Sequence, residues 1–399
     1  MMEAVLEYFN VILVRYGEIG VKGVGTRRRM EGLLVKALKE ALESFKVKGK
    51  IEVSEGRIFI WEPEDVEAAV KAAARVFGVK SLSPAYATEF AGLEDLVARA
   101  SEFFSEKVKG KVFRVRARRV GLHSFTSKDV ERALGAKLLE LGASKVNLEN
   151  PEYTAYVEIR GRRLFLYDKI HEGPRGLPLG SEEPVLVLFS GGFDSTVASW
   201  TLMKRGCPVH LVHYDLGFPE TVKVALEAAK FLSDNWSYGH RMKMYIVNFK
   251  GAALIVNGLV SPPYRTLVMR KLMVKHAESL AEKLGIEALA TGESISQVAS
   301  QTIRNIHLIE RNTKLPILRP LAGMDKDEII KISMKIGAYE INKKQIEVCG
   351  LAATPTPKGR LGRFEKELDK ASDIIVPDPI EVDLKNSSLK EALEKLGLL

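Results

Sequence analysis

The alternation of apolar and polar residues predicts small α+β units in the first part of the chain. "NVILVRYGEI" (residues 10–19) alternates with a period of two, as in a half-buried strand. The apolar residues of "TRRRMEGLLVKALKEALESF" (26–45) recur at helical spacing, and "KIEVSEGRIFIWE" (50–62) predicts a hairpin that turns at Glu55 and Gly56. These elements predict a first domain over residues 1–60.

A second α+β unit is predicted over residues 61–171. An acidic start introduces the helix "EPEDVEAAVKAAARVFGV" (62–79), and later segments read as a strand, a helix and two further strands. Those segments are "KVFRVRARRV" (111–120), "SKDVERALGAKLLELG" (127–142), "EYTAYVEIR" (152–160) and "RRLFLYDKI" (162–170). The Gly- and Pro-rich stretch "HEGPRGLPLGSEEP" (171–184) predicts a linker into a third domain, residues 172–399.

The pattern after residue 184 changes to strands that alternate with helices. The candidate strands are "VLVLFS" (185–190), "VHLVHYD" (209–215), "MKMYIVNF" (242–249), "EALATGE" (287–293) and "PILRPL" (316–321). Most are nearly continuous apolar runs, which is typical of a parallel sheet with helices on both faces. The predicted fold class is therefore α/β for this domain, preceded by two small α+β domains. "KNSSLKEALEKLGLL" (385–399) predicts a short C-terminal helix.

Composition excludes several classes of protein. Two cysteines in 399 residues exclude a disulfide framework and a four-cysteine metal site, and we predict no metal-ligand set. No apolar run reaches the length of a membrane span, and the N-terminus lacks the features of a signal peptide, so we expect a cytoplasmic protein that does not insert into membranes. The net charge is +9, of which residues 1–180 supply +6 (31 Lys/Arg against 25 Asp/Glu), which favours a polyanionic partner.

The segment "SGGFDS" (190–195) is the strongest chemical signal in the chain. It follows the first strand of the α/β domain and opens a helix, where such sheets bind ligands. Gly191 and Gly192 let the backbone approach a ligand, Ser190 and Ser195 add hydroxyl donors, and the helix start favours an anion. The pattern fits neither a Walker A loop nor a dinucleotide-binding loop. It resembles the PP-loop of ATP pyrophosphatases, and we expect Asp194 to organise phosphates or metal there.

Four further segments resemble the tRNA 4-thiouridine synthetase family. They are "LVRYGEIGVKG" (13–23), "HEGPRGLPLGS" (171–181), "ATGESISQVASQTIRN" (290–305) and "LRPLAGMDKDEII" (318–330). The resemblance implies an N-terminal ferredoxin-like domain, an RNA-binding THUMP domain and a PP-loop catalytic domain. It implies that the enzyme uses ATP, with Mg²⁺ expected, to adenylate O4 of uridine 8 in tRNA. Sulfur then replaces that oxygen and gives 4-thiouridine.

The resemblance also assigns the nucleotide contacts. These fall on Leu188, Phe189, His213, Tyr214, Arg270, Gly292 and Gln301. His213, Tyr214 and Gly292 lie at or near the ends of predicted strands, on the same edge as the phosphate loop. We further expect Ser294, Gln297 and Gln301 to form a polar stripe along a helix. Phe193 and Thr196 stand where the family usually has Ile and Pro, a change that leaves the backbone donors in place.

Two basic clusters are predicted to bind tRNA. Strand alternation places Arg114, Arg116 and Arg118 on one face of "KVFRVRARRV", with the apolar residues between them on the other. The second cluster lies at a loop–helix junction and comprises Lys22, Arg27, Arg28 and Arg29. Folded RNA is recognised mainly by its shape and backbone, which suits such clusters.

Sulfur transfer requires a reactive thiol, and the two cysteines differ. Cys349 lies in a segment that resembles the one holding the family's functional cysteine, near Lys343, Lys344 and Lys358, whose charges would lower the pKa of its thiol. Cys207 stands before the second strand, at the opposite edge, and is predicted to be structural. Many family members add a C-terminal rhodanese domain, and we expect the form without it. The immediate sulfur donor would then be a separate persulfide carrier or free sulfide.

Two other functions stay open at this point. One is a PP-loop ligase that joins ammonia to a small carboxylate, although it would leave the arginine stripe and Cys349 unused. The other is a tRNA-binding protein with an inactive nucleotide site, against which the intact "SGGFDS" loop argues. The oligomeric state is also open, because apolar residues in the last helical turns are compatible with a homodimer.

Overall fold

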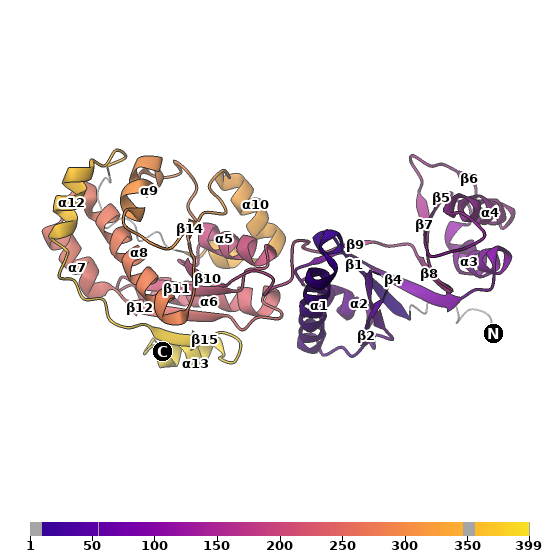
Figure 1. Cartoon of the computed structure of the whole chain (residues 1–399), viewed down its shortest axis with the longest axis horizontal. Helices are drawn as coiled ribbons and strands as arrows, with labels where there is room; N and C mark the ends of the chain where they lie inside the picture. Colours follow the sequence, from indigo (N-terminus) through magenta and orange to yellow (C-terminus); the bar gives the residue numbers. More distant parts are fainter. Residues whose placement is uncertain (1–9, 55, 346–355, 399) are drawn as a thin grey trace. The chain divides into compact units, whose positions relative to one another are not determined.

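The computed structural model describes residues 10–54, 56–345 and 356–398, and forms two compact units (Figure 1). The first unit comprises residues 1–176 and the second comprises residues 177–399. The division lies inside the predicted linker. Among the described residues, no helix is both long enough and apolar enough to span a membrane.

The first half of unit one is a β-α-β-β-α-β arrangement. Its elements are β1 (Val11–Tyr16), the 3-10 helix η1 (Glu18–Val21), α1 (Val24–Ser44), β2 (Lys50–Ser54), β3 (Arg57–Trp61), α2 (Val66–Ala73) and β4 (Val79–Glu89). The four strands are ordered β2-β3-β1-β4. The helical spacing of Met30, Leu34, Leu38 and Ala41 is confirmed, because all four are buried on one side of α1. Antiparallel pairing of β2 with β3 confirms the predicted hairpin.

β4 is one strand shared by the two halves of unit one. Residues 79–85 pair with β1, and residues 86–89 pair with β8. The sheet that starts at β1 therefore continues beyond residue 60, where the sequence predicted the first domain to end. The result is a single nine-stranded sheet in the order β2-β3-β1-β4-β8-β7-β5-β6, with β9 (His171–Glu172) paired to β4.

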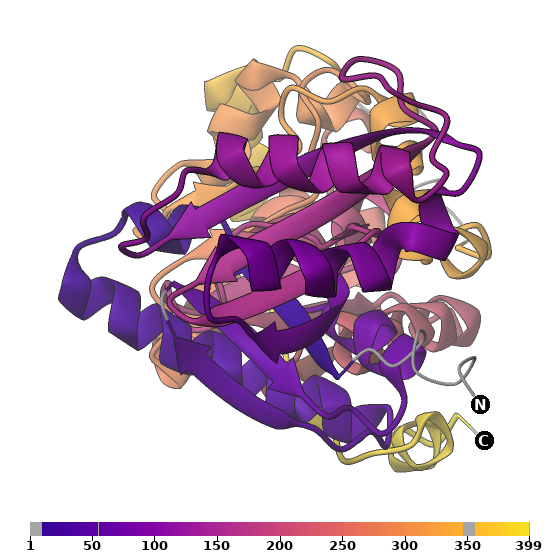
Figure 2. The same cartoon turned by 90° about the vertical axis from the view of Figure 1, so that its right-hand side faces the viewer.

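The second half of unit one packs two helices on one face of its strands. Its elements are α3 (Leu93–Val108), β5 (Val112–Val120), α4 (Ser127–Glu140), β6 (Lys145–Val146), β7 (Tyr153–Arg160) and β8 (Arg163–Tyr167). Figure 2 shows α3 and α4 side by side in front of the strands. Their core holds Phe104, Phe113, Val115 and Val157, the inward residues of the alternating pattern. The opposite face of β5 bears the arginine stripe.

Unit two contains a six-stranded sheet in the order β14-β13-β10-β11-β12-β15. Its strands are β10 (Val185–Leu188), β11 (Val209–Asp215), β12 (Lys243–Asn248), β13 (Leu289–Ala290), β14 (Ile317–Leu318) and β15 (Ile380–Asp383). The first five are the predicted strands, and all pair in parallel. β15 is an antiparallel addition that the sequence pattern did not predict, because "IEVD" is polar and gives a weak strand signal. The predicted α/β fold class is confirmed.

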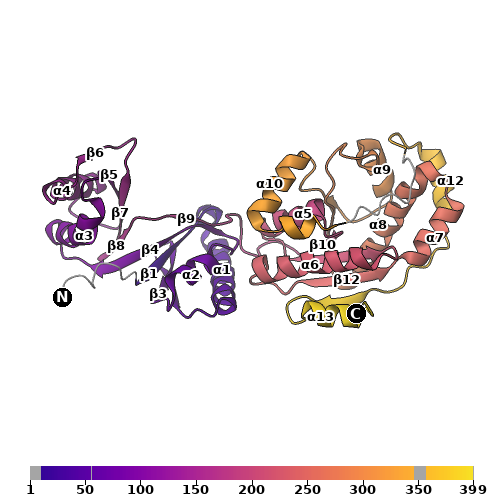
Figure 3. The ribbon, with the colours of Figure 1, turned by 180° about the vertical axis from the view of Figure 1, so that it is seen from behind.

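Helices cover both faces of this sheet (Figures 1 and 3). α7 (Lys250–Leu259), α8 (Arg265–Leu284), α9 (Ile303–Glu310) and α12 (Leu361–Asp369) pack on one face. α5 (Phe193–Lys204), α6 (Pro219–Trp236), α10 (Lys326–Ile336) and α11 (Tyr339–Asn342) pack together on the other. The predicted C-terminal helix is present as α13 (Leu389–Lys395) and contacts α6.

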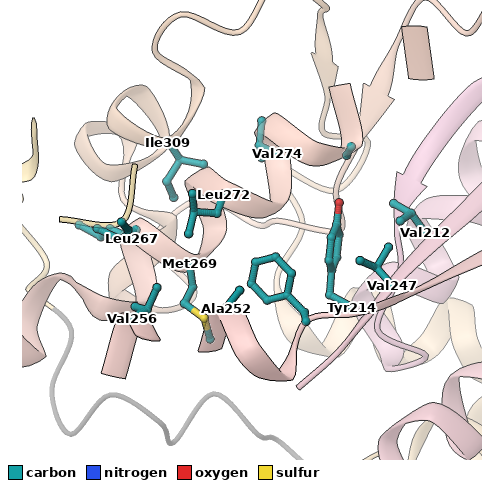
Figure 4. Packing of buried hydrophobic residues seen from close by; sticks show 14 of the residues in the cluster. Val212, Tyr214, Val247, Ala252, Val256, Leu267, Met269, Leu272, Val274 and Ile309 are labelled. Atoms are coloured by element: carbon teal, nitrogen blue, oxygen red, sulfur yellow. The ribbon is translucent and has the colours of Figure 1, made fainter. Parts of the chain in front are cut away.

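A large hydrophobic core of unit two lies between the sheet and α7–α8. Figure 4 shows Val212 and Val247 of the sheet beside Tyr214, with Val256 and Met269 from the two helices. This core places α8 along the carboxyl ends of the strands, so that one face of the helix is free to line a ligand pocket.

Candidate active site

The loop of residues 190–195 is organised around the hydroxyl of Ser195. Ser195 Oγ accepts hydrogen bonds from the backbone N–H groups of Ser190 (3.2 Å) and Gly191 (3.1 Å). Behind the loop, the buried amide of Asn342 donates to the Gly191 carbonyl and to Thr196 Oγ1, both at 2.9 Å. These bonds fix the loop before any ligand arrives. The sequence pattern gave no sign of Asn342, which is distant from the loop along the chain.

The start of α5 presents backbone donors at this loop. By helix geometry the N–H groups of Phe193, Asp194 and Ser195 have no acceptor within the helix. They can therefore bind an anion, which the helix dipole also favours. The Ser190 and Gly191 N–H groups donate within the loop, so the first turn of α5 remains for a ligand.

Two glycines allow the backbone to pack closely around the loop. Gly191 has φ of 83°, and a Cβ there would lie 2.6 Å from the Ala225 Cα atom. At Gly292 a Cβ would lie 2.6 Å from the Asp194 carbonyl carbon and 2.7 Å from the Ser195 nitrogen. The segment just after β13 thus touches the backbone of α5, which is possible only with glycine at position 292.

A cavity of about 300 Å³ opens beside the loop along α8. Most of the residues predicted to contact the nucleotide line it: Leu188, Phe189, Ser190, Asp194, Ser195, His213, Tyr214, Arg270, Gly292 and Gln301. Gly191 and Gly192 belong to the adjoining loop rather than to the wall. The cavity is further lined by Thr291, Glu293 and Arg319. The predicted residues come from several separate elements, and the fold brings them together.

His213 presents an unpaired acceptor to this cavity. Its Nδ1 atom lies 2.9 Å from the Phe189 carbonyl, and since a carbonyl can only accept, Nδ1 bears the proton. Burial lowers the pKa of His213 and keeps the ring neutral, although the Phe189 hydrogen bond opposes the shift. Nε2 is therefore an acceptor, and it has no partner among the described residues. The same holds for Oε1 of the buried Gln301.

Tyr214 forms a fixed part of the cavity wall. Its hydroxyl donates to the Met273 carbonyl of α8 at 2.7 Å, and burial raises its pKa well above the ordinary value. Its ring packs edge-on against Phe249, at a centroid distance of 5.2 Å. Tyr214 therefore stays neutral and contributes shape rather than charge.

The carboxylate of Asp194 is held by two polar side chains. Lys326 Nζ lies 2.7 Å from Oδ1, and Gln297 Nε2 donates to Oδ2 at 3.1 Å. Lys326 is the first residue of α10, whose start is fixed by a capping box between Asp325 and Glu328. The segment "MDKDEII" contributed to the family resemblance, but Lys326 itself was not assigned to the site. The only feature of the sequence that could have assigned Lys326 to the site is its position in the first turn of a helix.

Glu293 is a buried carboxylate in the wall of the cavity. It accepts from Arg270, from Arg319 Nε at 2.8 Å and from Thr291 Oγ1 at 2.9 Å. Arg319 in turn pairs with Glu310. This network fixes the guanidinium of Arg270, which was predicted to contact the nucleotide. Glu293 and Arg319 occur in "ATGES" and "LRPL", so those motifs contained site residues that we did not single out.

The predicted polar stripe along a helix is wrong. Residues 295–296 form a turn, residues 297–298 form a bend, residues 299–301 form a 3-10 turn, and α9 begins only at Ile303. Ser296 adopts φ of 64°, which an α-helix cannot contain. Ser294 donates to the Met324 carbonyl at 2.6 Å, and Gln297 reaches Asp194. Tertiary hydrogen bonds thus override the helical spacing of these residues.

The two cysteines lie in different settings. Cys349 falls outside the described residues, as does the segment 346–355 that contains it. The nearest described residue before it, Gln345, lines the cavity, and Thr356 after it donates to the Pro263 carbonyl beside α8. Cys207 is half-buried just before β11, and burial, helped by Glu182, raises the pKa of its thiol. A raised pKa disfavours the thiolate.

The arginine stripe has the predicted geometry. Arg116 and Arg118 are exposed on β5, and Arg114 is half-buried because it donates to Thr154 Oγ1 and to the Leu148 carbonyl. In the second cluster, Lys22 precedes α1, Arg27 is half-buried, and Arg28 and Arg29 are exposed in the first turns of the helix.

Comparison with known proteins identifies the family. Over 98% of its length the chain is 57% identical to a "Probable tRNA sulfurtransferase" of Aeropyrum pernix, and the match covers 99% of that protein. The chain belongs to the tRNA sulfurtransferase family. It is also 40% identical, over 95% of its length, to the "tRNA sulfurtransferase" of Pyrobaculum aerophilum, 77% of which is covered.

Family models and a solved structure agree with this membership. The model "Thiamine biosynthesis protein (ThiI)" matches residues 180–372, the ThiI ferredoxin-like domain matches 11–83, and the THUMP domain matches 90–168. The chain is similar to a crystal structure described as a 4-thiouridine synthetase–RNA complex with bound ATP, at 30% identity and a TM-score of 0.77. That match covers 92% of this chain and 95% of the other. In this tRNA sulfurtransferase, the ThiI region contains the cavity and the THUMP region contains the arginine stripe.

Proposed function

We propose that this chain is an ATP-dependent tRNA sulfurtransferase that makes 4-thiouridine at uridine 8. The observation that supports it most is one cavity that joins the "SGGFDS" loop, Gly292 and Arg270, in a chain 57% identical to a probable tRNA sulfurtransferase over almost its whole length. A small-carboxylate ligase and an inactive tRNA-binding protein are disfavoured by the same observation.

ATP binds with its phosphates at the start of α5. The free N–H groups of the first turn and the guanidinium of Arg270 then face negative charge. The unpaired acceptors His213 Nε2 and Gln301 Oε1 need hydrogen-bond donors, and the adenine amino group and ribose hydroxyls of ATP supply them. Leu188, Phe189 and Tyr214 surround the base with apolar surface and backbone groups.

The reaction has two displacement steps. Uridine O4 attacks the α-phosphorus, an O–P bond forms, and the bond to the β-phosphate breaks with release of pyrophosphate. Charge that develops on the leaving group is stabilised by the α5 donors and Arg270. A sulfur nucleophile then attacks C4 of the adenylated base, and AMP departs with the former O4.

Cys349 supplies or assists the sulfur nucleophile. It stands four positions after Gln345, the last described residue before it, and Gln345 lines the cavity. When a separate persulfide carrier is the donor, its terminal sulfur passes to Cys349 by thiol–persulfide exchange, which leaves the carrier as a thiol. The disulfide that then joins Cys349 to the base after attack on C4 is opened by an external thiol, which releases 4-thiouridine. When free sulfide is the donor, it attacks C4 itself, and Cys349 assists without carrying the sulfur. We assign Cys207 a structural role, because it is half-buried and burial raises the pKa of its thiol.

Mg²⁺ accompanies the nucleotide. Mg²⁺ is usually held by one or two carboxylates together with substrate phosphates. Asp194 is the carboxylate beside the phosphate loop. It fits that role once Lys326 and Gln297 release their hydrogen bonds to it. Among the described residues there is no cluster of three or more His, Cys, Asp or Glu side chains that could hold a metal ion.

tRNA binds the first unit through the arginine stripe and the cluster at Lys22, Arg27, Arg28 and Arg29. Replacing Arg114, Arg116 and Arg118 by alanine should weaken tRNA binding and reduce the slope of log Kd against log salt by about 0.7–0.9 for each phosphate that is no longer neutralised. An unchanged slope would show that the tRNA phosphates do not contact these three arginines. Because the substrate is tRNA, we expect a cytoplasmic location. Analytical ultracentrifugation would test whether the chain forms a homodimer.

The decisive test is 4-thiouridine formation on unmodified tRNA with ATP, Mg²⁺ and sulfide. Wild type and Cys207→Ala should form product and Cys349→Ala should not. Product from all three would support the enzyme class and show that Cys349 is not required for the reaction. Pyrophosphate release that depends on tRNA, without thiolation, would show that adenylation is right and that a dedicated sulfur carrier is required. Binding of tRNA with neither activity would contradict the proposal.

A further inference from the structure

Glu158 lies at the centre of a buried ionic cluster in unit one, far in sequence from the catalytic motifs. Its side chain is 1% exposed. It accepts from Arg57 Nε at 3.1 Å and from Arg160 Nε at 2.8 Å, and it pairs with Arg15 at 3.4 Å. A carboxylate buried this deeply is stable only while its cationic partners stay in place.

The partners of Glu158 come from both halves of the unit. Glu158 and Arg160 belong to β7 of the THUMP region, whereas Arg15 and Arg57 belong to β1 and β3 of the ferredoxin-like region. Arg15 also donates to Ser83 Oγ on the shared strand β4, at 3.0 Å. Its guanidinium lies 4.8 Å from the centre of the Tyr167 ring on β8. One carboxylate therefore ties the strands of the first half to those of the second.

Glu158 is also the direct neighbour of the arginine stripe. The register of β5 and β7 pairs Arg114 with Thr154, Arg116 with Tyr156, and Arg118 with Glu158. Paired residues in a sheet project from the same face. Thus the face that presents the stripe is the face on which Glu158 binds the first half of the unit.

Apolar packing continues this junction. Phe59 of β3 stacks on Phe165 of β8, with ring centroids 5.1 Å apart, and Tyr156 stacks on Tyr167 at the same centroid distance. Val11 and Leu13 of β1 complete the cluster. The ionic bonds of Glu158 thus add directional contacts between the halves to this apolar packing and to the shared strand β4.

We propose that Glu158 is a positioning residue for tRNA, which locks the ferredoxin-like and THUMP regions into one rigid RNA-binding surface. The proposal rests on the proposed function. tRNA that contacts the stripe and the cluster at the start of α1 together gains more affinity when the two are held at a fixed spacing. Glu158 itself is too deeply buried to touch RNA.

The test compares Glu158→Gln with a half-buried carboxylate, Asp168, whose partners stay within one half. Asp168 accepts from Tyr153 at 3.0 Å and from Lys107 at 3.4 Å, all inside the THUMP region, so Asp168→Asn is the matched control. Glu158→Gln should weaken tRNA binding by about tenfold or more and reduce its salt slope, because the two basic clusters no longer engage the RNA together. Asp168→Asn should change the affinity by less than about threefold, and ATP binding should change in neither variant.

A double variant separates positioning from mere loss of stability. Removing both partners of a buried pair destabilises less than removing one, so Arg57→Gln/Glu158→Gln should recover part of the lost thermal stability. It should not recover tRNA affinity. If the affinity recovers together with the stability, or if folded Glu158→Gln binds tRNA like wild type with an unchanged salt slope, the proposal is wrong.

Hydrogen exchange tests the proposal without tRNA. The amides of β4, which bond to both halves, should exchange faster in Glu158→Gln and not in Asp168→Asn. If this difference in exchange is present but wild type does not bind tRNA, the proposed function is wrong. The role of Glu158 in holding the two halves together is then still supported. If tRNA binds and the exchange of β4 is the same in both variants, the positioning role fails alone.

Discussion

A Cβ atom at position 292 would lie 2.6 Å from the carbonyl carbon of Asp194, so the segment just after β13 and the first turn of α5 are in backbone contact. We predict that Gly292→Ala pushes the two apart and abolishes ATP binding. Overpacking of this kind should also lower the free energy of unfolding by about 1–3 kcal/mol. Isothermal titration calorimetry and thermal unfolding measure the two effects.

Gly251 provides the control for that variant. It lies in α7, and a Cβ atom there would point into open space, with no neighbouring element within 4 Å. Gly251→Ala should therefore leave ATP binding unchanged and stabilise the helix by about 0.5–1 kcal/mol. Wild-type ATP affinity in Gly292→Ala would show that the close approach at position 292 is not required.

Glu293→Gln should raise the KM for ATP more than it lowers kcat. The substitution removes the charge that pairs with Arg270 and Arg319, and charge-assisted hydrogen bonds of this kind contribute about 1.5–3 kcal/mol each. Arg270 would then be mobile rather than aimed at the phosphates. Glu310→Gln, which affects Arg319 and leaves the Arg270 pair intact, should have a smaller effect in the same steady-state assay of pyrophosphate release.

Lys326→Gln should lower kcat for pyrophosphate release by about 10²-fold or more, if Lys326 neutralises charge beside the phosphate loop. The effect on stability should be below about 1 kcal/mol, because the Lys326 and Asp194 side chains remain 43% and 26% exposed. Lys331→Gln, on an exposed position of the same helix, should behave as wild type. A similar loss in both variants would indicate a general charge effect.

The buried carboxylate of Glu158 should make unit one sensitive to acid. Burial raises its pKa, but the charges of Arg57, Arg15 and Arg160 together lower it further, so its pKa in the folded protein lies below the ordinary value of 4.5. A lowered pKa means that the unfolded chain takes up the proton first. The stabilisation is therefore fully present above about pH 5 and is lost as the pH falls through 4.5 towards the folded value.

Urea unfolding at a series of pH values measures this loss. One such group contributes a slope of at most about 1.4 kcal/mol per pH unit. Glu158→Gln should reduce the slope between pH 5 and the folded pKa by up to that amount. An identical pH dependence in wild type and Glu158→Gln would contradict the prediction.

The sequence predicted the structural elements correctly where the local pattern and the fold agree. The parallel strands of unit two, the "SGGFDS" turn and the alternation of β5 all follow from local periodicity. The membership of His213, Arg270 and Gln301 in one cavity came from the family resemblance, since those residues are far apart in sequence. Their roles, and those of Cys349 and both basic clusters, remain predictions.

Other features depend on tertiary contacts that a single sequence does not reveal. The turn at residues 295–296 is set by the bond of Ser294 to Met324 and by the approach of Gly292 to α5. Lys326, Glu293 and Asn342 enter the site only because distant elements pack together. The sequence of β4 does not indicate that the strand pairs with both halves of unit one. It has the ordinary alternation of a single strand.

The antiparallel strand β15 has a consequence for the solubility of unit two. It occupies the edge of the sheet beside β12, where it pairs residues 380–383 with residues 243–246, and Lys243 forms an ion pair with Glu381. Without it, the apolar β12 would present an open row of backbone donors and acceptors to other molecules. The C-terminal strand thus protects the sheet from edge-to-edge aggregation, and a truncation placed before Ile380 would remove that protection.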